Sequence, residues 1–120
     1  MARMIFVCTH GREDAERATL PFVAANIAAQ VGQDSIVLLT IEGAWLCTDG
    51  YADAIQAEGL PALAPLVREF VEKGGTIWGC GACTKPRGIT EADLVKGATI
   101  VGAATVIEAV AGGAQMVPFA

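Results

Sequence analysis

Two kinds of hydrophobic pattern alternate along the chain. Continuous apolar runs predict buried strands at residues 4–9, 35–41, 76–79 and 98–101, and residues 115–118 predict a short edge strand. Between these runs, apolar residues recur at three- and four-residue spacing, which is typical of amphipathic helices. The first helical stripe comprises Leu20, Val23, Ala24, Ile27, Ala28 and Val31.

Proline and glycine mark the ends of the two longer helices. Pro21 lies near the start of the first helix or kinks it, and Gly32 ends it. Pro61 stands at the favoured first-turn position of the second helix, which ends at Gly74. The core stripe of this helix is Leu63, Leu66, Val67, Phe70 and Val71.

The remaining segments give shorter or weaker patterns. Thr90 can cap a short helix, with Asp93 supporting its first turn. A last helix is lined by Val106, Ile107 and Val110. Residues 42–59 have no definite pattern, and residues 80–88, which follow the third strand, are expected to form a loop because they contain glycines and Pro86.

Alternating strands and helices predict an α/β fold. Such a chain forms right-handed crossovers around a mostly parallel sheet of about five strands, with helices on both faces. With 120 residues, no linker and no repeat, residues 1–120 are expected to form a single domain. Ligands of such sheets bind beyond the carboxyl ends of the strands, so the segments that follow the strands are where a site is expected.

Composition limits the classes of partner and location. Hydrophobic residues make up 53% of the chain and charged residues 18%, which is apolar for a small monomer and suggests a subunit interface. A net charge of −5 argues against nucleic acid. The N-terminus does not resemble a signal peptide, and no apolar stretch reaches the length of a spanning helix. We therefore expect a cytoplasmic protein that does not insert in membranes.

The densest chemistry lies between residues 79 and 88. Cys80 and Cys83 are three residues apart at the end of the third strand, and Lys85 and Arg87 follow them. Cysteine is nucleophilic as a thiolate, and nearby cations favour that form. These four residues are the best candidates for a reactive site, although two thiols that merely pack a tight loop would show the same spacing.

Three further residues follow other strands at the same edge. His10, the single histidine, is either a hydrogen-bonded residue at the rim or a base for a cysteine. Trp45 is expected to form a pocket wall or an interface anchor. Cys47 is more typical of a packed apolar thiol than of a catalyst. Cys47, Cys80, Cys83 and His10 are also ligand types that suit zinc, although they do not form two matching pairs.

Several segments together resemble a known family. They are Thr9-His10-Gly11, Glu16 to Phe22, Gly43-Ala44-Trp45-Leu46, Gly50-Tyr51-Ala52 and Cys80 to Ile89, the last with the pattern C-x-x-C-x-x-x-R-G-[IV]. This set is similar to the DsrE-like branch of the DsrE/DsrF/DsrH sulfur-relay superfamily, and the resemblance extends over essentially the whole chain. It implies a three-layer α/β/α sandwich and a homo-oligomer such as a trimer or hexamer. We expect no cofactor and no metal.

The resemblance also implies persulfide chemistry with a sulfur-donor or acceptor protein. In members with one loop cysteine, that residue precedes the closing glycine by eight positions, and Cys80 has this spacing to Gly88. Other members have both cysteines, so Cys83 is an alternative nucleophile or a resolving thiol. We therefore predict a sulfur carrier or sulfurtransferase with Cys80 and Cys83 at its centre and His10, Trp45, Lys85 and Arg87 around the substrate. The alternatives are a non-catalytic oligomeric or zinc-binding protein and a dithiol redox protein, which ranks last because no helix is expected directly after Cys80.

Overall fold

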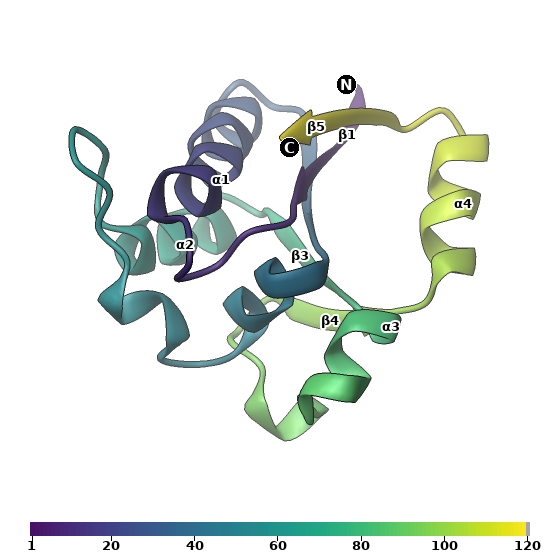
Figure 1. The fold of residues 1–120 in the computed structure, drawn as a ribbon. Helices are drawn as coiled ribbons and strands as arrows, with labels where there is room; N and C mark the ends of the chain where they lie inside the picture. The colour runs from purple at the N-terminus through teal and green to yellow at the C-terminus, as the bar shows by residue number, and fades with distance from the viewer. Residues whose placement is uncertain (120) are drawn as a thin grey trace.

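The computed structural model describes residues 1–119, which contain a five-stranded sheet in the order β4-β3-β2-β1-β5 (Figure 1). Every neighbouring pair of strands is parallel, which confirms the predicted sheet. The strands are β1 (Arg3–Cys8), β2 (Asp34–Leu39), β3 (Thr76–Cys80), β4 (Ala98–Val101) and β5 (Gln115–Phe119).

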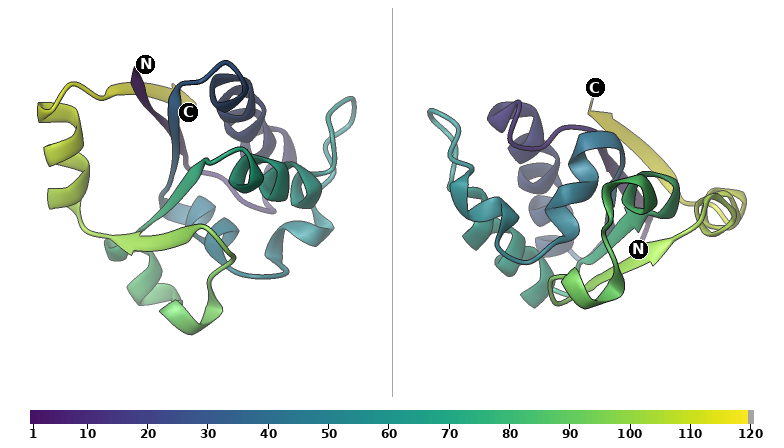
Figure 2. Two further views of the ribbon diagram at one scale, coloured as in Figure 1. Left: turned by 180° about the vertical axis from the view of Figure 1, so that it is seen from behind. Right: turned by 60° about the horizontal axis from the view of Figure 1, so that its bottom comes forward.

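The helices cover the two faces of the sheet unequally. On one face, α1 (Ala15–Gln30) packs beside α2 (Leu63–Glu72). On the other face, α4 (Ala103–Ala111) lies apart from these two helices (Figure 2). A single helix therefore forms the third layer of the α/β/α arrangement. Within residues 1–119, no helix is long and apolar enough to cross a bilayer.

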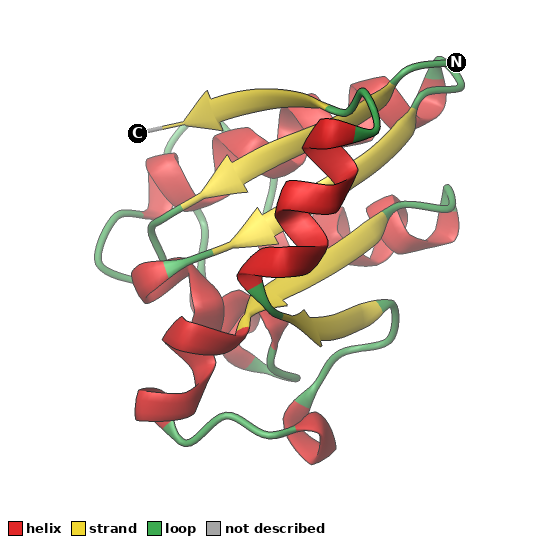
Figure 3. Cartoon of the chain, turned by 90° about the vertical axis from the view of Figure 1, so that its right-hand side faces the viewer, coloured by secondary structure: helices red, strands yellow, loops and turns green. Residues whose placement is uncertain are grey.

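The position of α4 follows from the strand order. β4 and β5 lie at opposite edges of the sheet, so the chain that joins them must cross the whole sheet. Figure 3 shows α4 running across the near face of the strands. Ala109 is its buried residue, whereas Ile107 and Val110, two of the three apolar residues predicted to line this helix, are exposed and do not face the core. The small side chain of alanine lets the helix approach the sheet closely.

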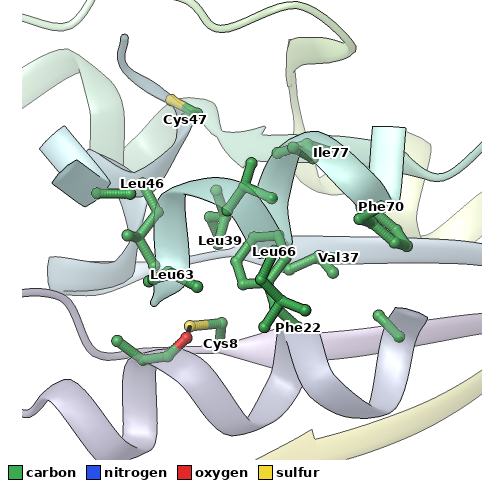
Figure 4. Packing of buried hydrophobic residues seen from close by; sticks show 14 of the residues in the cluster. Cys8, Phe22, Val37, Leu39, Leu46, Cys47, Leu63, Leu66, Phe70 and Ile77 are labelled. Carbon is green, nitrogen blue, oxygen red and sulfur yellow. Dashed lines mark hydrogen bonds between the residues drawn. The ribbon is translucent and has the colours of Figure 1, made fainter. Parts of the chain in front are cut away.

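The larger core lies between the sheet and the pair α1 and α2. Phe22 of α1 and Phe70 of α2 are fully buried and pack edge to face, with their ring centroids 6.0 Å apart (Figure 4). The stripe predicted for the second helix is confirmed at Leu63, Leu66, Val67 and Phe70, all buried. On the α4 side, a smaller cluster centres on Ile5, Ile36, Leu38 and Trp78.

Local structure differs from the prediction at the start of α2 and after β2. α2 begins at Leu63 rather than at Pro61, because Ala62 has an extended ψ of 137° and so precedes the first helical turn. The segment after β2, which had no definite pattern, forms the 3₁₀ helices η1 (Ile41–Cys47) and η2 (Tyr51–Ala54). The Thr90–Asp93 capping box is confirmed, and it opens the short 3₁₀ helix η4 (Glu91–Asp93).

Candidate functional site

The carboxyl ends of β2 and β3 bring η1 and the two-cysteine segment together. Cys80 is the last residue of β3 and the residue before the helical turn α3 (Gly81–Thr84). A 3₁₀ turn, η3 (Lys85–Arg87), follows directly, and Gly88 ends it with a left-handed φ of 70°. The expectation of a loop over residues 80–88 is therefore wrong. Pro86 is compatible with the turn because the first residues of a helix need no internal N–H donor.

Cys80 and Cys83 are neighbours because of this turn. They occupy the N-cap and third positions of α3, whose side chains lie next to each other. Both are free thiols of intermediate exposure, and the Cys80 thiol is close enough to influence the pKa of Cys83. Burial raises the pKa of Cys83, and the adjacent Cys80 adds to this, so its neutral form is favoured in the isolated chain.

A backbone N–H from η1 points at the Cys83 sulfur. The amide of Ile41 donates to Cys83 Sγ over 3.1 Å, which partly offsets the effect of burial on the pKa of this thiol. Ile41 has a φ of 55°, which a β-branched residue rarely adopts. Strained conformations of this kind persist where the surrounding structure imposes them, and they occur often at functional sites.

Arg87 connects the same segments through polar contacts. Its Nε and Nη2 donate to Glu42 Oε1 over 3.3 and 3.1 Å, and its Nη1 donates to the Cys83 carbonyl over 3.1 Å. The guanidinium charge also acts to lower the pKa of Cys83, although more weakly than burial raises it. Arg87 therefore positions the backbone of the cysteine turn, residues 80–88. Glu42 neutralises part of the charge on the Arg87 guanidinium.

The other two cysteines lie in the core, among apolar side chains (Figure 4). Cys8 is completely buried and its thiol donates to the carbonyls of His10 and Ala18. Burial raises the pKa of Cys8 to about 12 and that of Cys47 to about 11. Both therefore stay protonated near neutral pH, as expected for the packed thiol predicted at Cys47.

His10 makes its side-chain contact away from the two half-buried thiols. Its Nδ1 lies 2.6 Å from Glu13 Oε2, and the Gly11 amide donates to the other oxygen of Glu13. Desolvation of Glu13 opposes ionisation, but these contacts hold its pKa below the usual range. His10 follows β1, which is separated from β3 by β2. None of the hydrogen bonds described within residues 1–119 joins it to Cys80 or Cys83.

A shallow hollow of about 550 Å³ lies beside the cysteine turn. Trp45 and Arg87 line it, which brings together two of the predicted substrate-binding residues. The remaining lining residues are Thr48, Asp49, Gly88, Ile89, Ala92 and Asp93. Trp45 also stacks on Tyr51, with their ring centroids 6.0 Å apart. Lys85 is exposed on η3 and does not line this hollow.

The arrangement gives the zinc alternative no support. In the part of the chain that the structure describes, no three His, Cys, Asp or Glu side chains are grouped so that they could hold a metal ion. Cys47 packs against the Gly79 backbone inside the core, and His10 is engaged with Glu13. The four ligand types noted in the sequence are therefore not brought to one point.

Ile41 and Glu42 were not predicted as site residues. Glu42 could have been suspected, because it follows a predicted strand and can pair with the cations after Cys83. The contribution of Ile41 comes from its backbone amide and from an unusual φ. No property of an isoleucine side chain reveals either feature.

A family model and two solved structures match nearly the whole chain. A model of the DsrE/DsrF-like family matches residues 2–119. The solved structure of the ychN protein from E. coli superposes with a TM-score of 0.81 at 16% identity, covering 99% of this chain and 100% of that one. MTH1491 of Methanobacterium thermoautotrophicum, a protein of unknown function, has a TM-score of 0.76 at 17% identity, covering 98% and 99%. At these identities the two structures show the fold.

Two curated relatives are uncharacterised archaeal proteins. MJ0760 of Methanocaldococcus jannaschii is 32% identical over 102 residues, which are 85% of this chain and 37% of that protein. MK0008 of Methanopyrus kandleri is 28% identical over 82 residues, which are 68% of this chain and 64% of that protein. The chain thus matches just over a third of the first relative and less than two thirds of the second.

Proposed function

The chain belongs to the DsrE/DsrF-like family, and on that premise we propose that it is a sulfur carrier that holds sulfane sulfur as a persulfide on Cys80. In the loading step, the Cys80 thiolate attacks the outer sulfur of a donor persulfide. The donor S–S bond breaks, a new S–S bond forms on Cys80, and the donor leaves as a thiolate. No net oxidation occurs, and the sulfur can pass to an acceptor cysteine by the same exchange.

The observation that carries this proposal is the pairing of two free, half-buried thiols at the carboxyl edge of the sheet. Transfer of a sulfur atom requires a thiol that a donor can reach, and thiolate character decides its reactivity. Cys80 ends the strand next to the solvent-facing turn. The Ile41 amide and Arg87 supply a donor group and positive charge on the side of Cys83.

Partners and location belong to the same proposal. A donor or acceptor protein would present its own cysteine to the exposed side of the turn, where Lys85 adds positive charge and Trp45 and Arg87 offer a contact surface. Ile107, Val110 and Met116 are exposed apolar side chains, which supports assembly into a homo-oligomer. A reducing cytoplasm would keep the thiols free.

The test is loading of the reduced protein with thiosulfate or polysulfide, followed by intact mass measurement. Wild type should gain about 32 Da, the mass of one sulfur atom, and Cys80→Ser should lose this gain. Cys47→Ala is the matched control, because it removes a thiol that lies in the core, and it should load like wild type. Retained loading in Cys80→Ser, or no loading in any form, would contradict the assignment of Cys80.

A further inference from the structure

From the positions of the two thiols on one helical turn we infer that this protein also reduces its bound sulfur: Cys83 attacks the Cys80 persulfide, releases sulfide and leaves a Cys80–Cys83 disulfide. This inference rests on the proposed persulfide at Cys80. It assigns a reaction to the second thiol, which a simple carrier does not need.

The geometry of the turn favours the disulfide. Disulfides require Cα atoms about 4.4 to 6.8 Å apart and Cβ atoms about 3.5 to 4.5 Å apart. Side chains at the N-cap and third positions of a helix lie on the same side of the first turn, and these are the positions of Cys80 and Cys83. The Cys80 thiol is already close enough in the reduced protein to influence the pKa of Cys83. These two positions on the turn therefore suit a disulfide.

The atoms and electrons of the step balance. The Cys83 thiolate attacks the inner sulfur of the Cys80 persulfide, a new S–S bond joins the two cysteines, and the S–S bond of the persulfide breaks. The outer sulfur leaves as hydrosulfide with the bonding electron pair, so the sulfane sulfur is reduced and the two cysteines are oxidised to the disulfide. A dithiol reductant then restores both thiols by exchange.

The surroundings of Cys83 fix its position and favour its protonated form. The Ile41 amide donates to its sulfur and Arg87 holds its carbonyl, so the side chain is fixed in place beside Cys80. Burial raises the pKa of Cys83 and thereby keeps its thiolate scarce. Because a scarce thiolate attacks slowly, we expect transfer to precede reduction when an acceptor is present.

The experiment follows the loaded protein over time without oxygen. Wild type, Cys83→Ser and Cys83→Ala are loaded with polysulfide, freed of excess donor and sampled for intact mass and for released sulfide. Wild type should lose the added sulfur, finish about 2 Da below the reduced mass, and release one sulfide for each loaded chain. Both Cys83 variants should keep the added sulfur and release no sulfide. Cys47→Ala serves as the control and should behave as wild type does.

Two results would overturn the inference, and they differ in whether the proposed carrier function also fails. If wild type keeps its persulfide as long as Cys83→Ser does, Cys83 is not the reductant, while the carrier function stands. If neither wild type nor the variants take up sulfur, the carrier function and the reduction fail together.

Discussion

The four cysteines form two contrasting pairs. Cys8 and Cys47 lie in the core, where burial raises their pKa values to about 12 and about 11. Cys80 and Cys83 lie on one helical turn at the edge of the sheet and are half-buried. Yet Cys47 lies next to the strand that ends at Cys80, because a methyl group at Gly79, the residue before Cys80, would lie 3.1 Å from Cys47 Sγ.

The register of the sheet accounts for the different surroundings of Cys8 and Cys80. Cys8 is level with Leu39 and Gly79, and Cys80 is one residue further along. Successive side chains of a strand point to opposite faces of a sheet. Cys8 points into the core beneath α1, whereas Cys80 stands at the end of β3, where the chain turns into α3. Local surroundings, rather than residue type, therefore separate structural thiols from candidate reactive ones.

The largest expected difference is in alkylation. In native wild-type protein at pH 8, iodoacetamide should modify Cys80 and Cys83 at least about a hundredfold faster than Cys8 and Cys47, because the core thiols are both inaccessible and protonated. Peptide mapping over a time course measures the four rates. Unfolding in urea should make the rates similar. Fast labelling of Cys8 in the folded protein would contradict the distinction between core thiols and accessible thiols.

Gly43→Ala should disturb both regions at once. The added methyl group would lie 2.5 Å from the Cys8 carbonyl oxygen, a contact that requires the backbone to move. Because Gly43 lies just after Ile41 and Glu42, the same movement should displace the amide that donates to Cys83. We expect a loss of about 3 kcal/mol in the free energy of unfolding, measured with urea.

The matched control for Gly43→Ala is Gly102→Ala, which has open space at this position and a negative φ of −90°. This control should change stability by no more than about 0.5 kcal/mol. Equal stability of Gly43→Ala and wild type would show that η1 is not held against β1 as described.

Alkaline pH should destabilise the protein through the core thiols. Cysteines of the unfolded chain ionise near pH 9.0, whereas the pKa of Cys8 in the folded protein is about 12. Above pH 9 the folded state therefore binds more protons, and stability is lost progressively as pH rises from about 9 to about 12. By pH 10 the loss from Cys8 alone should be about 1 kcal/mol.

Urea unfolding at pH 8 and pH 10 tests this dependence. Cys8→Ala should be less stable than wild type at both values, because it leaves a small cavity, but its stability should fall less between them. The same alkaline loss in Cys8→Ala and wild type would show that Cys8 is not its source.

Gly79→Ala should reveal how closely Cys47 packs against the strand that ends at Cys80. Its methyl group would press on Cys47 Sγ at 3.1 Å, and we expect a loss of about 1 kcal/mol in the free energy of unfolding. Cys47→Ala removes the sulfur atom, so the effect of Gly79→Ala should shrink in that background. Additive effects in the double variant would mean that the two residues do not share this contact.

The smallest expected effect concerns the charge near Cys83. Glu42→Gln removes the carboxylate that neutralises Arg87, so the guanidinium should lower the pKa of Cys83 further and speed its alkylation severalfold. Arg87→Met should slow alkylation instead. Opposite shifts in the two variants, measured as alkylation rate against pH, support the arrangement. An unchanged profile in both would show that Arg87 has no electrostatic effect on this thiol.

The sequence predicted the layers better than the details of the site. Strands β1 to β5 and the α2 stripe follow from long apolar runs and helical spacing, signals that tertiary packing reinforces. The closeness of Cys80 and Cys83 follows from their spacing at the end of a strand. These features depend on short stretches of neighbouring residues, which is why they could be predicted.

Other features depend on contacts that are distant in the sequence. The left-handed φ of Ile41 is unfavourable locally, and it is imposed where Gly43 packs against the backbone of Cys8 and His10. The glycines and Pro86 after Cys80 favour a loop, yet residues 81–87 form helical turns. The exposed position of Ile107 reflects the path of α4 across the sheet, which depends on the pairing of β5 with β1.

The most direct test of the account is to locate the sulfur in wild-type protein. Reduced protein is loaded with polysulfide, the thiols are trapped by alkylation, and peptides are analysed by mass spectrometry for an added sulfur atom. The account predicts the addition on Cys80 at early times, none on Cys8 or Cys47, and a later shift to a Cys80–Cys83 disulfide. Sulfur spread equally over all four cysteines, or found only on Cys8 and Cys47, would contradict it.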